Sequence, residues 1–120
     1  MKSAAKLGIH FTNHSDYMVT PLDPLFTVWT AVNRLSRTGR VIGPDERISP
    51  RQALKAITLD AAWQYGEENS KGSISPGKLA DLVILDGNPL TIDPVAIKNI
   101  QIMATYKKGK LVYSAPTAAP

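Results

Sequence analysis

The order of the expected elements along the chain indicates an α+β fold. Amphipathic helical segments fill most of the first half, and short apolar segments separated by Gly and Pro turns fill the second half. Helices and strands that are segregated along a chain favour α+β over alternating β/α units. The 120 residues, 43% of them hydrophobic and 20% charged, are enough for one modest domain with a core.

The N-terminal residues predict the end of a helix followed by a strand. Residues 3–7 fit the last turn of a helix, because Gly8 can act as its left-handed cap. Residues 9–13 are predicted to form a short strand. The chain would then begin in the middle of an architecture, at a helix that leads into a strand.

Three helices are expected in the first half, and two of them carry clear start signals. Asp23 suits an N-cap before Pro24, and the apolar stripe that follows should end near residues 38–39. Ser49 and Gln52, separated by Pro50 and Arg51, form a capping box that begins the second helix. A short third helix is expected from about residue 58 and should close at Gly66.

The second half predicts β structure. Residues 82–85 form a continuous apolar run that is typical of a buried strand, and Pro76-Gly77 forms the turn before it. Residues 100–106 and 111–113 are predicted to be two strands of a hairpin, with a glycine in the turn between them. Residues 114–120 have little to bury and are predicted to be a flexible tail.

Composition excludes several classes of function. The formal net charge is +4, but the basic residues are spread out and lack interleaved aromatics, so no nucleic-acid partner is expected. The absence of cysteine excludes disulfides, thiolate metal sites and cysteine nucleophiles. No apolar run reaches the ~20 residues of a membrane span, and the start does not resemble a signal peptide. We therefore expect a soluble cytoplasmic protein with no membrane partner.

Few residues could carry chemistry, and they lie near the N-terminus: His10, His14 and Asp16. On a strand, His14 and Asp16 would point to the same face, where an imidazole and a carboxylate could bind a metal or move protons. The spacing fits a surface histidine and a turn aspartate equally well. A catalytic zinc site usually takes three protein ligands, so two histidines cannot form a typical hydrolytic centre alone.

A longer pattern resembles a known family. Residues 72–86, GSISPGKLADLVILD, resemble the C-terminal signature of the amidohydrolase superfamily, and the hairpin at residues 106–113 is similar to theirs. Read from the residues alone, residues 72–86 build a turn and a strand and do no chemistry. Residues 14–16, 21–25 and 47–54 resemble the branch called amidohydrolase family 3, of the YtcJ-like type.

The resemblance implies a fold and a site. It implies that residues 1–68 are the last strand and terminal helices of a metal-bearing (β/α)8 barrel, and that residues 69–113 are part of a small β-sandwich. It places Asp16 at the end of the eighth barrel strand, as a metal ligand and as the acceptor of a proton from the attacking water. His14 would contact the substrate or the groups around the metal ligands. No other cofactor-binding residue is expected.

The resemblance also implies what this chain lacks. A barrel takes ~250 residues, so the other metal ligands, on earlier strands, cannot be present. The parent enzyme would use a divalent metal, which is expected to be zinc. With it the enzyme would hydrolyse non-peptide C–N bonds of amides or cyclic amides in small molecules. This piece alone would bind no metal tightly and be inactive, and its partner would be the missing barrel portion or a second copy. The alternative is an autonomous structural or interaction domain that self-associates without catalysis.

Overall fold

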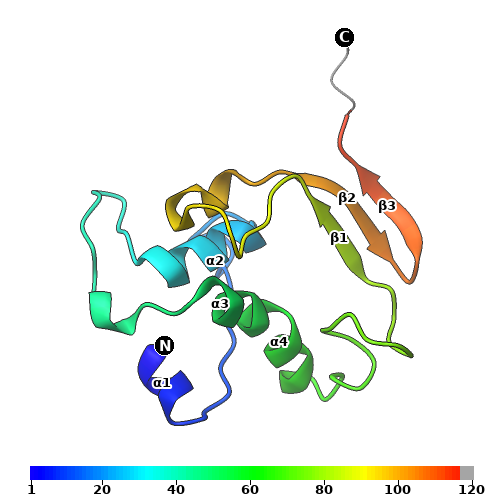
Figure 1. Cartoon of the computed structure of the whole chain (residues 1–120), viewed down its shortest axis with the longest axis horizontal. Coiled ribbons are helices and arrows are strands. Elements are labelled where there is room, and N and C mark those ends of the chain that lie inside the picture. The colour runs from blue at the N-terminus through cyan, green and yellow to red at the C-terminus, as the bar shows by residue number, and fades with distance from the viewer. Residues whose placement is uncertain (117–120) are drawn as a thin grey trace.

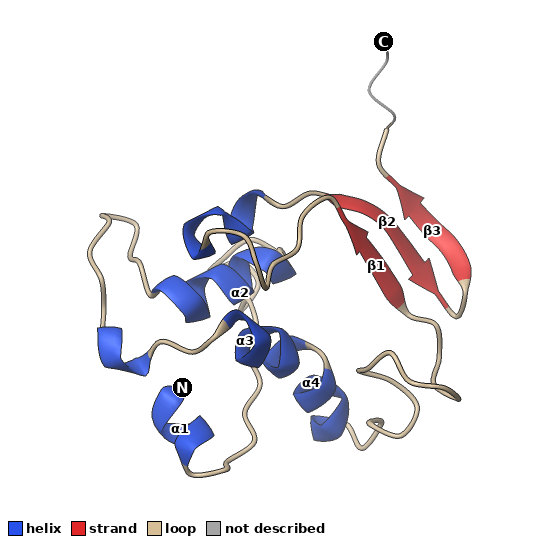
Figure 2. Cartoon of the chain, in the orientation of Figure 1, coloured by secondary structure: helices blue, strands red, loops and turns tan. Residues whose placement is uncertain are grey.

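The computed structural model describes residues 1–116, in which a helical part lies beside a three-stranded sheet (Figures 1 and 2). This arrangement confirms the α+β class. The elements in chain order are α1 (Lys2–Lys6), α2 (Pro24–Asn33), the 3-10 helix η1 (Pro44–Glu46), α3 (Pro50–Ile57), α4 (Leu59–Gln64), β1 (Leu82–Leu85), the 3-10 helix η2 (Pro94–Asn99), β2 (Ile102–Lys107) and β3 (Lys110–Ser114).

The hydrophobic core surrounds α2, which packs against α3 and η2. Buried polar contacts fix the fit between α2 and η2. The indole Nε1 of Trp29 donates to the carbonyl of Val95 at 2.9 Å, and the amide of Asn33 donates to the carbonyl of Pro94 at 2.8 Å. The buried core residues are Val28, Trp29, Ala31, Val32, Ile48, Ala53 and Ile97.

The helix start signals are confirmed. The Asp23 carboxylate accepts from the amides of Leu25 at 2.9 Å and Phe26 at 3.1 Å, which satisfies two of the free donors at the start of α2. At the start of α3, Ser49 and Gln52 form the reciprocal pair of a capping box. Both helices also have proline in the first turn, where a missing N–H costs nothing.

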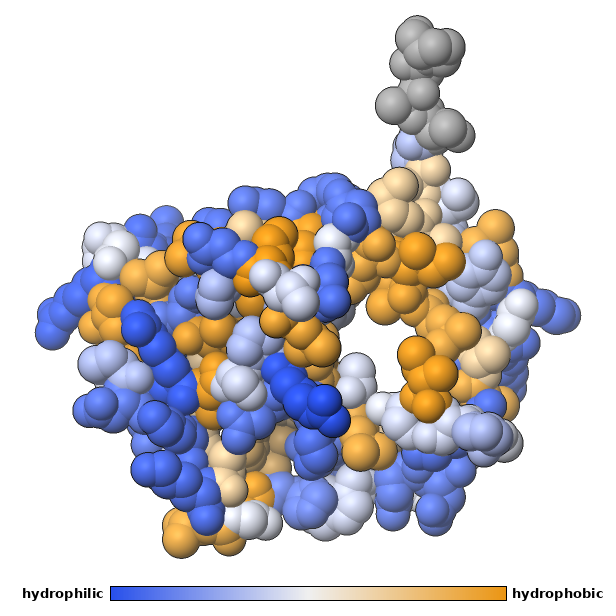
Figure 3. Space-filling view, viewed as in Figure 1, coloured by the Kyte–Doolittle hydropathy of each residue, from blue (hydrophilic) through white to orange (hydrophobic). Residues whose placement is uncertain are grey.

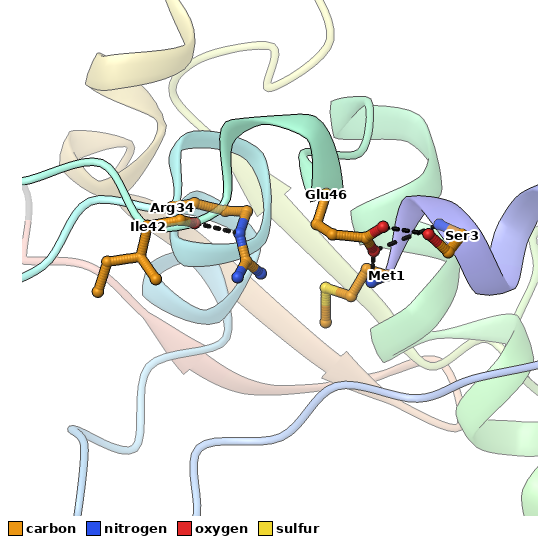
Figure 4. A network of polar contacts seen from close by, with 5 residues as sticks. All are labelled: Met1, Ser3, Arg34, Ile42 and Glu46. Carbon is orange, nitrogen blue, oxygen red and sulfur yellow. Dashed lines mark hydrogen bonds and ion pairs between the residues drawn. The ribbon is translucent and has the colours of Figure 1, made fainter.

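The prediction for the end of α2 is wrong by about five residues. The helix stops at Asn33 because Arg34 adopts a left-handed conformation with φ 52°. Arg34 then begins a narrow loop: the amide of Ile42 donates to its carbonyl at 2.9 Å, and its Nε donates to the Ile42 carbonyl at 2.6 Å (Figure 4). Leu35 leaves the helical stripe and pairs with Val41 in an isolated β-bridge.

α1 is held by a single carboxylate. Figure 4 shows Glu46 of η1 receiving the N-terminal ammonium of Met1 and the hydroxyl of Ser3. The hydrogen bond from the ammonium, followed by those from Ser3, lowers the pKa of Glu46 from 4.5 to about 2.

The prediction of a strand at residues 9–13 is wrong for this chain. The segment leaves α1 as an open loop and passes beside α3 and α4 (Figure 1). A strand needs a neighbour for its backbone hydrogen bonds, and no segment among residues 1–116 pairs with this one.

The sheet has the order β1-β2-β3 and is antiparallel throughout. The hairpin between β2 and β3 is confirmed, with Gly109 at φ 75°. Asp81 and Asp86 flank β1 and accept from the amides of Lys108 at 2.7 Å and Gln101 at 2.8 Å, so that each carboxylate ties β1 to backbone outside it. The turn glycine Gly77 also has a positive φ, of 88°.

The expectation that β1 is buried is wrong. Val83 and Ile84 are 51% and 50% exposed, because no layer within residues 1–116 covers the sheet. Figure 3 shows apolar side chains around an opening between the sheet and the helical part. A groove of about 630 Å³ lies there, between α3, α4 and β1.

Part of the expected flexible tail belongs to the sheet. Ser114 is the last residue of β3, and the amide of Ala115 donates to the carbonyl of Met103 at 2.8 Å. Residues 117–120 lie outside the described residues. Within residues 1–116, every helix is too short to cross a membrane.

Candidate functional site

His14 and Asp16 lie in a tight turn between the N-terminal segment and α2. Asp16 has φ 48°, a left-handed conformation that aspartate tolerates better than most residues. The amide of Val19 donates to the Asp16 carbonyl at 2.8 Å, and the hydroxyl of Thr20 donates to the carbonyl of Ser15. The turn therefore holds the backbone of residues 15–20 with its own hydrogen bonds.

The two candidate side chains do not lie side by side as they would on a strand. The amide of Asp16 donates to Nδ1 of His14 at 3.0 Å, so the ring turns back onto the backbone. That bond uses the lone pair of Nδ1. Nε2 of His14 is then the ring nitrogen that remains available for other contacts. The expectation that His14 and Asp16 point to the same face of a strand is wrong, because the chain turns at Asp16 instead of continuing in an extended form.

The two residues differ in what surrounds them. His14 lines a cleft of about 210 Å³, together with Asn13, Asp23, Thr27 and others from α2 and α3. Asp16 lies outside that cleft. Its carboxylate is exposed and makes no hydrogen bond within residues 1–116.

The donor set for a metal is incomplete among the described residues. Residues 1–116 contain no group of three or more His, Cys, Asp or Glu side chains close enough to hold an ion. Asp16 can supply one oxygen ligand, whereas a catalytic zinc ion takes about three from the protein. The remaining ligands of any such centre must come from outside these residues.

Sequence reasoning missed the one buried acidic side chain near this segment. Asp60, at the start of α4, is 5% exposed and accepts from Nζ of Lys55 at 2.5 Å. His10 reaches the same carboxylate oxygen with Nδ1 at 3.2 Å, and its ring stacks on Trp63 at 4.4 Å between centroids. His10 lies 50 residues before Asp60 in the sequence, so no local pattern could reveal its contact with that carboxylate.

This cluster positions the segment that carries His14 and Asp16. Thr12 donates to the side chain of Gln64 at 2.8 Å, one helical turn beyond Asp60 on α4. Asn13 donates to the carbonyl of Thr27 on α2 at 3.2 Å. Contacts to two different helices thus lead the chain to the turn at residues 14–20.

The model of the amidohydrolase family matches residues 1–113, and the chain belongs to that family. The confirmed family agrees with the resemblance seen in residues 14–16 and 72–86.

Particular relatives can be named. The N-substituted formamide deformylase of Arthrobacter pascens is 31% identical over 113 residues, which cover 94% of this chain and 21% of that protein. A Bacillus subtilis (strain 168) protein, YtcJ, named as an amidohydrolase, is 32% identical and is matched over 93% of this chain and 22% of its own length. The chain thus spans about one fifth of these relatives.

A solved structure shares the fold. The crystal structure of an amidohydrolase from Thermotoga maritima MSB8 superposes with a TM-score of 0.67 at 26% identity. The match covers 95% of this chain and 25% of that one. The helical part and the sheet therefore occur together in a longer amidohydrolase.

Proposed function

We propose that this chain is the C-terminal part of a metal-dependent amidohydrolase that hydrolyses non-peptide C–N bonds. The observation that carries the proposal is the coverage: the family match runs through residues 1–113, while the chain spans only about one fifth of its relatives. A match of that shape is typical of one portion of a longer enzyme.

The proposed architecture divides the chain at residues 68 and 69. Residues 1–68 would be the last strand and terminal helices of a (β/α)8 barrel, with residues 9–13 as the strand. The open backbone of that segment supports the assignment, because the missing barrel strands would pair with it. Residues 69–113 would be part of a β-sandwich, and the exposed apolar side chains of β1 support this, since a second sheet would cover them.

Asp16 is the proposed catalytic residue. Its free carboxylate fits one ligand position and fits a base that takes the proton of the attacking water and returns it to the leaving amine. Zinc, when held by the complete polypeptide, would lower the pKa of water and polarise the scissile carbonyl. His14, which lines the adjacent cleft and uses only Nδ1 in its bond with the Asp16 amide, would orient the substrate. Because the other metal ligands would lie outside this chain, the 120-residue chain alone would have no activity.

The proposed substrate class is a small amide or cyclic amide. The name of the Arthrobacter pascens relative assigns it N-substituted formamides, which are amides with a non-peptide C–N bond. Specificity in barrels of this kind comes mainly from the loops that follow the strands, and most of those loops would lie outside this chain. The proposal therefore names a bond type and no single compound.

A chimera tests the proposal. Residues 1–113 would replace the matching segment of the Arthrobacter pascens deformylase, and hydrolysis of an N-substituted formamide would be measured with zinc present. We expect turnover by the chimera and none by the isolated chain under the same conditions. Turnover by the isolated chain would contradict the proposal, as would a chimera that folds, by circular dichroism, and binds zinc but shows no hydrolysis.

A second candidate function is an autonomous interaction domain without catalysis. The exposed apolar strands favour it, because a sheet with no covering layer is typical of an association surface. The oligomeric state of the isolated chain bears on this candidate.

A further inference from the structure

Asp60 is a buried carboxylate that holds side chains from two parts of the chain. It is 5% exposed and lies on α4, and its Oδ1 accepts from Nζ of Lys55 at 2.5 Å and from Nδ1 of His10 at 3.2 Å. Since a carboxylate can only accept, His10 donates from Nδ1. The ring of His10 also stacks on Trp63, with 4.4 Å between the centroids. One imidazole thus ties the N-terminal segment to α4 by a hydrogen bond and by packing.

A second contact fixes the direction of the segment along α4. The hydroxyl of Thr12 donates to Oε1 of Gln64 at 2.8 Å, and Gln64 lies one helical turn after Asp60. Two residues of extended chain span about 6.6 Å, and four residues of helix rise about 6 Å. The spacing of His10 and Thr12 therefore matches the spacing of their two partners on one face of the helix.

The neighbours of these two anchors in the sequence contact other elements. Phe11 packs against the hydrophobic core, and the side chain of Asn13 donates to the carbonyl of Thr27 on α2 at 3.2 Å. Alternate side chains thus have different partners, which is the period of two of an extended chain. The alternation defines one register for residues 10–13.

A shift of the segment by one residue would break this pattern. It would bring the apolar side chain of Ile9 or Phe11 to the carboxylate of Asp60, which would lose its hydrogen bond with an imidazole. It would also move Asp16 by about 3.3 Å, more than the ~1 Å misplacement that can lower a rate about 10²-fold. Backbone pairing with neighbouring strands does not by itself exclude the shift, because each of residues 9–14 offers the same donor and acceptor.

We propose that His10 and Asp60 are positioning residues, which set the register of residues 9–13 against α4 and so place Asp16 at the reaction centre. The proposal rests on the proposed function, because it concerns the place of the catalytic carboxylate. The contacts with α4 involve side chains alone, so the backbone edges of residues 9–13 stay available for the neighbouring barrel strands.

The test uses the deformylase chimera with zinc present and compares kcat and KM for an N-substituted formamide. His10→Ala should lower kcat at least about tenfold with little change in KM, since a displaced base weakens the chemical step more than binding. His10→Asn keeps an N–H donor at the position of Nδ1, and its kcat should stay within about threefold of that of the unchanged chimera. Glu67→Gln is the matched control: it breaks an ion pair with Lys71, outside the segment, and should leave kcat unchanged.

A double variant separates positioning from a general loss of structure. In an Asp16→Asn chimera, His10→Ala should lower kcat no further, because residues that act as one unit are not additive. An equal further loss in that background would overturn the proposal, as would a folded His10→Ala chimera with unchanged kcat. Failure of the proposed function is seen separately, as an Asp16→Asn chimera whose kcat is undiminished.

A readout on the 120-residue chain does not depend on turnover. The amide of Asp16 donates to Nδ1 of His14 at 3.0 Å, so its NMR chemical shift reports the geometry of the turn. This shift should change in His10→Ala, return towards its original value in His10→Asn and stay unchanged in Glu67→Gln. An unaffected Asp16 amide in a folded His10→Ala chain would contradict the positioning role.

Discussion

At the scale of single residues, Gly72 is the glycine at which an added side chain has the least room. It has φ 82°, and a Cβ built there would lie 2.7 Å from Cβ of Ala62 and 2.9 Å from Cα of Leu59. Backbone strain and a steric clash with α4 thus coincide at the residue that returns the chain from the helices towards the sheet.

The substitution Gly72→Ala should lower the free energy of unfolding by about 2–3 kcal/mol, since it adds overpacking to strain. Gly77→Ala is the control: Gly77 has φ 88° with nothing within 4 Å of the added atom, so only the strain of about 1 kcal/mol applies. Urea unfolding measures both. Equal losses in the two variants would show that packing against α4 contributes nothing.

Glu46 gives the chain a pH dependence at its N-terminus. Its pKa is about 2 in the folded chain, against an ordinary value of 4.5, because it accepts from the Met1 ammonium and from Ser3. A lowered carboxyl pKa stabilises the folded state above the unfolded value, and that stabilisation is lost as pH falls from 4.5 towards 2.

Glu46→Gln should therefore flatten the fall in the free energy of unfolding between pH 5 and pH 2. Asp45→Asn, at the adjacent exposed residue, should leave the slope closer to that of the unchanged chain. The measurement is urea unfolding at a series of pH values. An unchanged slope in Glu46→Gln would mean that the contact with α1 does not persist in solution.

At the scale of elements, the hairpin turn carries one residue that fits it poorly. Lys108 has φ 50° and precedes Gly109 at φ 75°, and two successive positive φ values define a type I′ turn, which favours Asn-Gly. Lys108→Asn should raise the free energy of unfolding by about 0.5 kcal/mol, because asparagine tolerates the left-handed region better. Lys107→Asn, within β2, should bring no gain. Thermal unfolding of both variants checks the difference.

Elements with local signals could be predicted from sequence, and elements that depend on neighbours could not. Asp23 and Ser49 cap their helices through atoms two or three residues away, so the pattern is sufficient. The left-handed turn at Arg34 is stabilised by contacts with Ile42, which no helical stripe reveals. The strand at residues 9–13 and the burial of β1 were predicted from apolar patterns that presuppose layers absent from residues 1–116.

The candidate site shows the same division. Asp16 is predicted from a family resemblance in a short motif; the family is confirmed, and the role of Asp16 stays a prediction. Its actual surroundings depend on the turn that the His14 ring makes with the Asp16 amide, which a strand pattern does not indicate. Asp60 was missed because His10, which lies 50 residues away in the sequence, meets it only in the folded chain.

At the scale of the whole molecule, the shape of the chain and the share of its relatives that it spans support the same proposal. The radius of gyration is 15.3 Å, whereas a compact domain of 120 residues has about 14 Å. The open form, the exposed sheet and the match to about one fifth of longer amidohydrolases all support the proposal that this chain is one part of a longer enzyme.

The most direct measurement of the central claim is the rate of amide hydrolysis by the deformylase chimera with Asp16→Asn, compared with Asp45→Asn. Asp45 is also an exposed carboxylate, and it lies away from the turn. We expect Asp16→Asn to lower kcat by about 10²–10⁴-fold, the range for loss of a general base, and Asp45→Asn to leave kcat unchanged. A folded, zinc-containing Asp16→Asn chimera with undiminished kcat would contradict the assignment of Asp16 to the catalytic centre.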